Sequence, residues 1–290
     1  MIGNIHQFCS LRWKDIIKIE TDNSDDEENE EFEFIYPEEK VAIPGKNPIE
    51  SDIRNVDLDS AVKMIADAKK PVILAGHGVL ISGASDEVII LSEKSSIPIS
   101  WTLLGSGAVP ASHPLNMGMM GMHGEFAANN AIHNADLLIA CGMRFDDRVT
   151  GKLNTFAPNA KVIHIDIDPA EVNKNRRVDV AIVSDVSKAV LKINEQSLKN
   201  KFTCQTKNWL EKIDFWKNKH PLYDPPKEGE IYPQEVLLKV REFSPEAYVT
   251  TDVGQHQMWA AQYLRNSPRK WISSAGLGTM GFGLPAAIGV

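Results

Sequence analysis

Short apolar runs that end in glycine or polar residues recur between residues 50 and 200. Leu137–Cys141 stops at Gly142, and Lys161–Ile167 is rich in β-branched residues. Neither run alternates with polar positions, so both predict strands that are buried on two faces. Three further runs predict strands on similar grounds: Val72–Ala75, Ile97–Trp101 and Val180–Val183.

Segments with helical spacing separate these runs. We expect helices near residues 57–69, 85–94, 124–134 and 185–195, with Asp57 or Asp59 capping the first and Asp185 the last. Strands that alternate with helices predict βαβ units and a parallel sheet. Residues 50–200 are therefore expected to form a doubly wound α/β domain. It follows an acidic, poorly ordered segment and connector, residues 1–49.

The expected ligand site lies beyond the carboxyl ends of these strands, because parallel sheets bind ligands there. Asp166 and Asp168 end one strand, a place where α/β folds hold a ribose hydroxyl. Glycines in the first turn would let backbone N–H groups approach phosphate, although a tight turn is the simpler explanation. The segments that should share this edge are Gly76-His77-Gly78, Thr102-Leu103, Gly142–Val149 and Asp166-Ile167.

Four charged residues lie within five positions, at Arg144, Asp146, Asp147 and Arg148. So many charges argue against a core position, and leave either a solvated loop or a functional one. The two guanidinium groups suit a diphosphate. The alternative is that they pair with the two neighbouring carboxylates.

The segment Asn116–Gly124 contains four methionines and three glycines in nine residues. Such a polarizable lining suits a flat aromatic ring. Composition alone favours the other interpretation, a loop that fills an irregular gap in the core. His77 and His123 have no partner at metal-ligand spacing, so we expect no metal site from them.

Residues 201–290 are expected to begin with a helix and a linker, residues 201–230, with the helix at about Thr203–Lys219. A second unit, residues 231–290, should hold a helix starting at Pro233, strands at Ala247–Thr251 and Trp271–Ser273, and a helix at Gln255–Leu264. Two strands are too few for an independent sheet. We therefore expect this unit to be the truncated start of another α/β domain, ending in an apolar helix at residues 283–290.

Charge and composition narrow the functional classes. Residues 20–39 hold 11 acidic residues and no basic one. This segment therefore carries more negative charge than the whole chain's net charge of −8, and the remainder of the chain is close to neutral. Without a basic stripe we expect no nucleic-acid partner, and without a long apolar run no membrane partner. Three separated cysteines fit neither a disulfide framework nor a zinc site. With no targeting segment recognised, the expected location is cytoplasmic, plastid and mitochondrion being the alternatives.

Five motifs follow one another along the chain: MGMHG (120–124), GMRFDDRVTGKLNTFAP (142–158), HIDIDPAE (164–171), DVGQHQMWAAQ (252–262) and GLGTMGFGLPAAIG (276–289). Together they closely resemble the catalytic large subunits of acetolactate synthase, or acetohydroxyacid synthase. These thiamine-diphosphate enzymes also bind FAD. The likeness covers about residues 31–290. It implies a whole central FAD-binding domain and the opening of a C-terminal pyrophosphate-binding domain.

The resemblance implies two sets of cofactor-binding residues. One set would bind FAD: Gly76, His77, Gly78, Thr102, Leu103, Met120, Gly121, Met122, His123, Gly142, Arg144, Asp146, Arg148, Val149, Asp166, Ile167, Asp185 and Val186. The other would lie around thiamine diphosphate: Val253, Gly254, Gln255, His256, Gly278 and Met280, with Gln257 and Met258 near both cofactors. The magnesium ligands and the activating glutamate of the family are expected outside this chain. No catalytic residue and no metal ligand is therefore assigned within it.

The activity implied is a decarboxylative condensation of two 2-oxo acids, pyruvate with pyruvate or 2-oxobutanoate, in branched-chain amino-acid biosynthesis. We expect the 290 residues alone to be inactive. The resemblance also implies a homo-oligomer and a regulatory small subunit. The alternatives are a non-catalytic FAD-binding remnant or pseudo-enzyme, and a sister enzyme such as pyruvate oxidase or glyoxylate carboligase. The motifs RFDDRVTGKL and QHQMWAAQ argue against the sister enzymes.

Overall fold

The computed structural model describes residues 53–200, 204–223, 230–264 and 268–290. The predicted acidic segment, residues 1–49, lies outside the described residues. So do Thr203, where one helix was expected to begin, and residues 224–229 of the expected linker. Among the described residues, no helix combines the length and the apolar character needed to cross a membrane.

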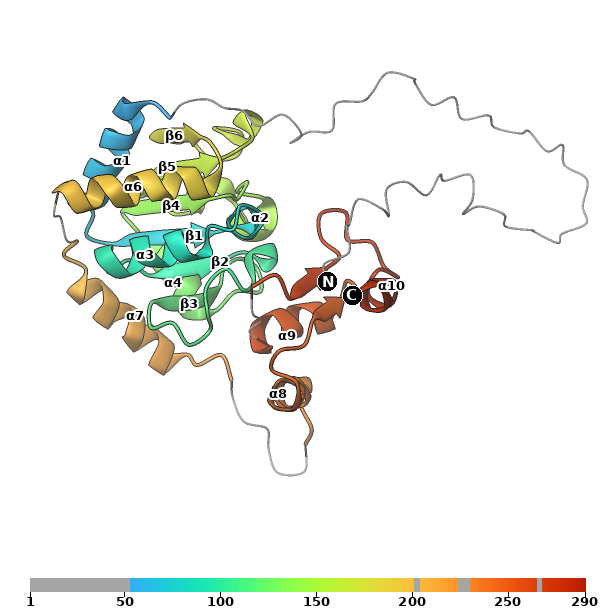
Figure 1. Ribbon diagram of the computed structural model, residues 1–290. Coiled ribbons are helices and arrows are strands. Elements are labelled where there is room, and N and C mark those ends of the chain that lie inside the picture. The colour runs from blue at the N-terminus through green and yellow to red at the C-terminus, as the bar shows by residue number, and fades with distance from the viewer. Residues whose placement is uncertain (1–52, 201–203, 224–229, 265–267) are drawn as a thin grey trace, which may run out of the picture. The chain divides into compact units, whose positions relative to one another are not determined.

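A six-stranded parallel sheet forms the centre of the first α/β unit (Figure 1). The strand order is β3-β2-β1-β4-β5-β6, and every neighbouring pair is parallel. This confirms the predicted doubly wound fold. The strands are β1 (Pro71–Ala75), β2 (Ile99–Trp101), β3 (Asn116–Met119), β4 (Leu137–Cys141), β5 (Lys161–Asp166) and β6 (Val180–Val183).

Helices cover both faces of this sheet (Figure 1). On one face α1 (Asn55–Asp67), α3 (Ser85–Ser95) and α6 (Val186–Asn200) pack over residues such as Ile73 and Ile139. On the other, α4 (Phe126–Asn134) and α7 (Lys207–Lys219) pack over Leu74 and Leu138.

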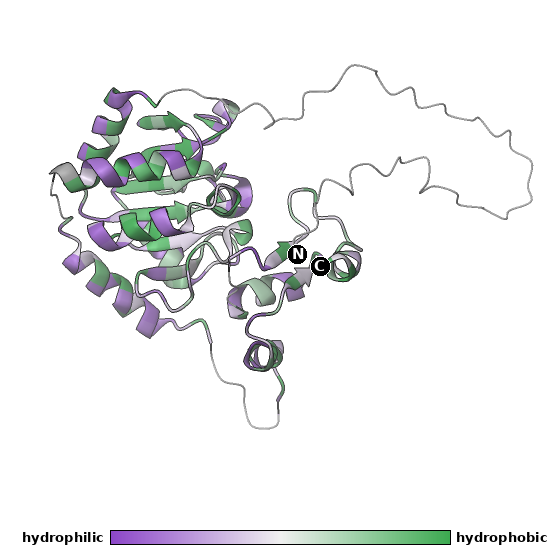
Figure 2. Ribbon diagram, viewed as in Figure 1, coloured by the Kyte–Doolittle hydropathy of each residue, from purple (hydrophilic) through white to green (hydrophobic). Residues whose placement is uncertain are grey.

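Successive side chains of one strand thus enter two different cores. Burial on both faces explains why the inner strands β1 and β4 are apolar without alternation, whereas the edge strands β3 and β6 alternate between buried and half-buried positions. Figure 2 shows the contrast between apolar strands and mixed helices.

Three local predictions were wrong. Helix α1 begins after Arg54, and Asp57 caps nothing; its carboxylate pairs instead with the Arg54 guanidinium, 2.7 Å away. The residues after Gly76, which were expected to form a tight turn, form the short helix α2 (His77–Ile81). Half of the methionine-rich segment is the edge strand β3, whose Met117 and Met119 side chains are buried. Asp185 does cap α6, accepting a hydrogen bond from the Ser187 amide at 2.9 Å.

The C-terminal segment contains α8 (Pro233–Phe243), β7 (Val249–Thr251), α9 (Gln255–Tyr263), β8 (Trp271–Ser273) and α10 (Gly283–Gly289). Strands β7 and β8 pair in parallel, with Thr251 opposite Ser273. Pro233 lies in the first turn of α8, as predicted.

Connecting turns complete the first unit. They are the 3-10 turns η3 (Leu103–Gly105), η4 (Leu153–Thr155) and η5 (Pro169–Glu171) and the short helix α5 (Asp147–Thr150).

Three glycines bring two loops into backbone contact between β1 and β4. The Gly76 amide donates to Cys141 O at 2.9 Å, and the Gly78 amide donates to Gly142 O at 3.0 Å. A Cβ on Gly76 would overlap the Gly142 carbonyl oxygen, and one on Gly78 would lie 2.6 Å from Gly142 Cα. Strand order reverses at this point, and in doubly wound sheets such a reversal opens the ligand crevice. Only glycine permits the two loops to approach so closely there.

We predict that Gly78→Ala lowers the free energy of unfolding by about 1–3 kcal/mol, because overpacking against a backbone is hard to relieve. Chemical denaturation would measure the change. Gly289→Ala is the matched control, since a Cβ there meets nothing within 4 Å. Equal effects of the two substitutions would show that the loop contact does not constrain the fold.

Candidate functional site

The carboxyl ends of all six strands meet along one edge of the sheet. Ala75 pairs with both Trp101 and Cys141, and the pairing extends outward to Met119 on one side and Val183 on the other. The loops at these ends therefore form one continuous row. The structure thus brings together the strand-end segments that the sequence predicted to share an edge.

The glycines at the centre of this edge bond to the protein's own backbone. The amides of Gly76, Gly78 and Gly142 all donate to backbone carbonyls, with Gly142 N 2.8 Å from Ile165 O. The Gly76 and Gly78 amides themselves are therefore used within the protein, and the approach of other backbone N–H groups of this turn to a phosphate stays a prediction. The contribution of these glycines is the close approach of two loops. Side-chain donors for an anion lie next to this contact, in the segment after β4.

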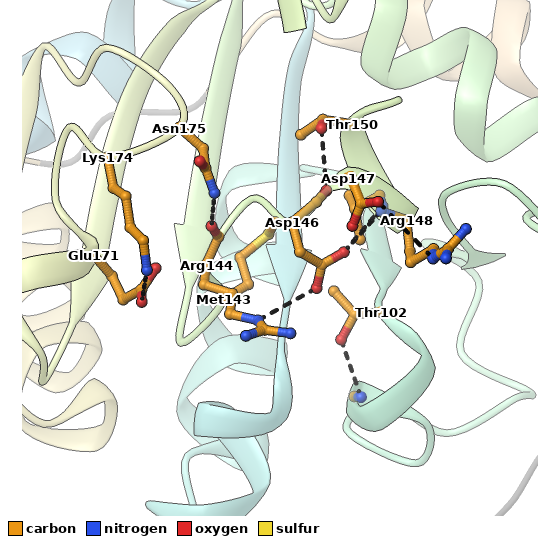
Figure 3. A network of polar contacts seen from close by, with 12 residues as sticks. Thr102, Met143, Arg144, Asp146, Asp147, Arg148, Thr150, Glu171, Lys174 and Asn175 are labelled. Carbon is orange, nitrogen blue, oxygen red and sulfur yellow. Dashed lines mark hydrogen bonds and ion pairs between the residues drawn. The ribbon is translucent and has the colours of Figure 1, made fainter. Parts of the chain in front are cut away.

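Two arginines follow β4 on the two sides of Asp146 (Figure 3). The Arg144 Nε lies 3.5 Å from Asp146 Oδ2, and the Arg148 Nε lies 4.0 Å from Asp147 Oδ2. Both arginine side chains are more than half exposed, at 59% and 75%. Pairing with the neighbouring carboxylates, the alternative left open by the sequence, thus occurs. At such distances and exposure it contributes little, so both arginines retain hydrogen-bonding capacity for an anion.

Asp146 also holds the turn that carries these arginines. Its carboxylate accepts hydrogen bonds from the amides of Arg148 and Val149, at 3.0 and 3.2 Å, and so caps α5. The Thr150 hydroxyl donates to Asp146 O at 3.0 Å (Figure 3). Asp146 is therefore a structural member of the loop as well as a predicted cofactor residue.

A carboxylate with altered acidity ends β5. Asp166 is partly buried, and this burial raises its pKa above the ordinary value, although the Asp168 amide bond and His164 act in the opposite direction. The Asp168 amide donates to Asp166 Oδ1 at 2.9 Å. Next to it Ile167 is 46% exposed, whereas Val186 is buried. The Asp166 carboxyl thus places hydrogen-bond acceptors at the carboxyl end of β5.

The methionines of β3 and the loop after it differ in exposure. Met117, Met119 and Met120 are buried in the two cores, which matches the gap-filling interpretation, but Met122 is 61% exposed. Asn129 holds this loop by two 2.9 Å hydrogen bonds with the Gly121 backbone, and the Met122 amide donates to Arg148 O at 2.8 Å. The sequence reasoning missed Asn129, since nothing in its helical neighbours marks it as a loop anchor.

Thr102 and Leu103 lead from β2 into η3. The Thr102 hydroxyl oxygen caps η3, accepting from the Gly105 amide at 3.2 Å. His77 and His123 are both exposed. A cavity of about 350 Å³ is lined by Trp101, at the carboxyl end of β2, and by Asn116, Glu125 and Lys217, among others. None of the predicted site residues lines it, so the strand-end edge remains the candidate site.

In the C-terminal segment, the turns after β7 and β8 also lie together. A Cβ on Gly278, which has φ +66°, would lie 3.4 Å from Val253 Cγ2. Gln255, His256 and Met280 are exposed, and Met258 is half-buried. Gln257, which is expected near both cofactors, is buried, and its amide nitrogen donates to Ser273 Oγ at 2.6 Å and Ser274 O at 2.8 Å. Its side chain therefore fixes α9 to β8.

Two family profiles match this chain. Residues 58–193 match the thiamine pyrophosphate enzyme central domain, and residues 252–290 match the thiamine pyrophosphate enzyme C-terminal TPP binding domain.

The acetolactate synthase large subunit of Parasynechococcus marenigrum (strain WH8102) is 50% identical over 260 residues, covering 90% of this chain and 42% of that protein. The large subunit of Porphyra purpurea is 48% identical over 264 residues, covering 90% and 44%. An acetolactate synthase of Mycobacterium leprae (strain TN) is 46% identical over 261 residues, covering 88% and 41%.

The chain spans less than half the length of these curated relatives. The two matched parts belong to the same kind of enzyme. The part that matches the central domain precedes the part that matches the C-terminal domain. The chain belongs to the thiamine pyrophosphate enzyme family and, within it, is similar to the large subunits of acetolactate synthase.

Proposed function

We propose that the strand-end edge of the first unit binds FAD, with the dinucleotide lying across the switch point between β1 and β4. The observation that carries this proposal is the close loop contact at Gly76, Gly78 and Gly142, directly at the point where strand order reverses. Doubly wound sheets of this order bind dinucleotides there. The flanking side chains fit the two chemically different ends of such a ligand.

The phosphate groups are assigned to the arginine loop. Arg144 and Arg148 both project from the loop after β4, and their present ion pairs are long and exposed. A guanidinium presents paired donors that match phosphate oxygens, which makes it a better partner for a diphosphate than for a distant carboxylate. On the same edge, Asp166 would accept hydrogen bonds from ribose hydroxyls at the adenosine end.

The flavin ring is assigned to the other side of the edge, near the exposed Met122 and the turn at Thr102–Leu103. A thioether packs favourably on an aromatic ring. Condensing two 2-oxo acids with loss of CO₂ transfers no net electrons, so this flavin would have a structural role and would not act as a redox centre.

We further propose that the whole protein is an acetolactate synthase large subunit that condenses pyruvate with pyruvate or 2-oxobutanoate, as a homo-oligomer with a regulatory small subunit. The names of the similar relatives support this proposal. Bound thiamine diphosphate would supply a carbon nucleophile for the 2-oxo acid. One wall around this cofactor would come from the two turns that meet after β7 and β8. Its residues would be Val253, Gly254, Gln255, His256, Gly278 and Met280.

We predict that the purified chain binds FAD and that Arg148→Ala weakens binding by about 1.5–3 kcal/mol, the contribution of a hydrogen bond to a charged group. Quenching of flavin fluorescence would measure both affinities. Lys161→Ala is the matched control. It also removes one positive charge, but from the opposite end of β5. Equal losses from both substitutions would mean that the effect is only general electrostatics, and wild-type protein without flavin binding would refute the site.

Asp166→Asn should separate stability from binding. Because the pKa of Asp166 is raised by folding, the ionised carboxylate destabilises the folded state at pH 7, and this cost disappears as pH falls through the raised pKa. The variant is therefore expected to melt at a higher temperature than wild type at pH 7, with the difference shrinking near pH 4, while FAD binding weakens. Asp59→Asn, at an exposed position on α1, should change neither property. A lower melting temperature for Asp166→Asn at pH 7 would contradict this assignment.

A chimera would test the activity of the whole protein. Residues 53–290 would replace the matching stretch of the Porphyra purpurea large subunit, which is 48% identical to this chain. Acetolactate formation from pyruvate, with FAD, thiamine diphosphate and Mg²⁺ added, is the expected result. A chimera that folds and binds FAD but makes no acetolactate would favour a non-catalytic FAD-binding remnant.

A further inference from the structure

The loop that carries Arg144 has an unusual backbone. Phe145 has φ +50°, and the preceding Gly142 has φ +59°. A bulky residue rarely adopts this left-handed conformation, because its Cβ clashes with the backbone. The turn exposes Arg144 while Met143 and Phe145 on either side are buried, at 5% and 2% exposure. Strained residues of this kind persist only where surrounding contacts hold them.

The first contact comes from His164 on β5. Its side chain is fully buried, and its Nε2 lies 2.7 Å from Met143 O. A carbonyl only accepts, so Nε2 carries the hydrogen and donates it. Asp166 Oδ2 is 3.8 Å from the same nitrogen, too far for a hydrogen bond. Alanines pair with His164 on both neighbouring strands, Ala140 and Ala181, and leave room for the imidazole.

Three further contacts complete the support. The Asn175 side-chain amide donates to Arg144 O at 3.2 Å (Figure 3). The Phe145 ring packs edge-on against the His164 imidazole, with centroids 5.2 Å apart, and against Phe156 at 6.3 Å. Two successive carbonyls of the loop are thus held from β5 and from the segment before β6. We call His164 and Asn175 the carbonyl clamp.

An apolar residue would fill the His164 position at lower cost. The Nδ1 atom of His164 is buried and has no hydrogen-bond partner among the described residues. A buried polar atom without a hydrogen-bond partner is unfavourable. A histidine at this position is therefore explained only if the rest of its side chain makes a useful contact. The hydrogen bond to Met143 O supplies one, because it fixes the backbone next to the arginine.

We propose that the carbonyl clamp positions Arg144 for an anionic phosphate group of the ligand at the strand-end edge. His164 is then a positioning residue, acting through the Met143 carbonyl and the Phe145 turn, and does not itself touch the ligand. This inference rests on the proposed FAD site. It adds which residues fix the orientation of Arg144 before the ligand binds. Such pre-organisation raises affinity because less ordering remains to be done on binding.

The test uses the full chain and three variants. His164→Leu removes the donor to Met143 O and keeps an apolar side chain in place. His164→Gln is the conservative rescue, because its amide nitrogen lies at a similar distance along the side chain as Nε2 and still donates. Ile163→Val is the matched control for core packing. This neighbouring residue on β5 is equally buried but belongs to the core of the opposite face.

Two quantities are measured for each variant: the FAD dissociation constant, and, without ligand, the rate of trypsin cleavage after Arg144. His164→Leu is expected to weaken FAD binding about tenfold or more and to accelerate cleavage after Arg144. His164→Gln should stay within about threefold of wild type in affinity, a change of about 0.7 kcal/mol. Ile163→Val should lower the melting temperature without changing either quantity.

The outcomes are distinct. If His164→Leu keeps wild-type affinity and cleavage, or if His164→Gln is as impaired as His164→Leu, the clamp is overturned. If His164→Leu does not fold, Asn175→Ala decides: removing the second carbonyl contact should accelerate cleavage after Arg144, and an unchanged rate overturns the clamp. If wild type binds no FAD, the proposed function fails, while the ligand-free cleavage rates still decide whether the clamp holds the loop.

Discussion

The site depends on one steric constraint, the backbone contact between the loops that follow β1 and β4. Gly76 and Gly78 lie against Gly142 so closely that a Cβ on any of them would overlap the opposite loop. Each of the three amides is used in a backbone hydrogen bond across the sheet edge. This contact determines where the β4 loop leaves the sheet. The positions of Arg144, Asp146 and Arg148 follow from it.

At this edge, exposed charged side chains are attached to a backbone that internal hydrogen bonds hold in place. Asp146 caps α5, Asn129 holds Gly121, and the Met122 amide joins the β3 loop to the β4 loop. The charged groups that would meet a ligand, by contrast, are only loosely paired. A site built in this way can bind an anion without first breaking strong internal interactions. The partly buried Asp166 shows the corresponding cost, since its raised pKa means that the folded protein holds an unfavourable charge at neutral pH.

Much of the fold was predictable because burial on two faces leaves a simple mark in the sequence. Mostly apolar runs located five of the six central strands, and polar residues at their ends located the edge. Strand β3 was missed because its sequence, Asn-Met-Gly-Met, lacks β-branched residues. The short α2 was missed because Gly76-His77-Gly78 is typical of a turn.

Within the site, the residue types were predictable and their partners were not. The bond from His164 to Met143 O joins residues 21 positions apart, and the left-handed φ of Phe145 has no signature in a phenylalanine. The partners of the Gly76 and Gly78 amides were unpredictable for a related reason. Glycine signals close approach, but the sequence does not say whether a ligand or another loop approaches. For Gly76 and Gly78 it is the Gly142 loop.

The central claim is that a dinucleotide lies along the carboxyl edge of the central sheet. Hydrogen–deuterium exchange of the full chain with and without FAD tests it most directly. FAD is expected to slow exchange in the peptides that follow β1, β4 and β5, which cover residues 77–81, 143–150 and 167–168. Exchange should stay unchanged in the peptides that precede the same strands, which cover residues 69–70, 135–136 and 159–160. Protection at the opposite edge, or around the cavity lined by Asn116 and Lys217 in place of the strand ends, would contradict it.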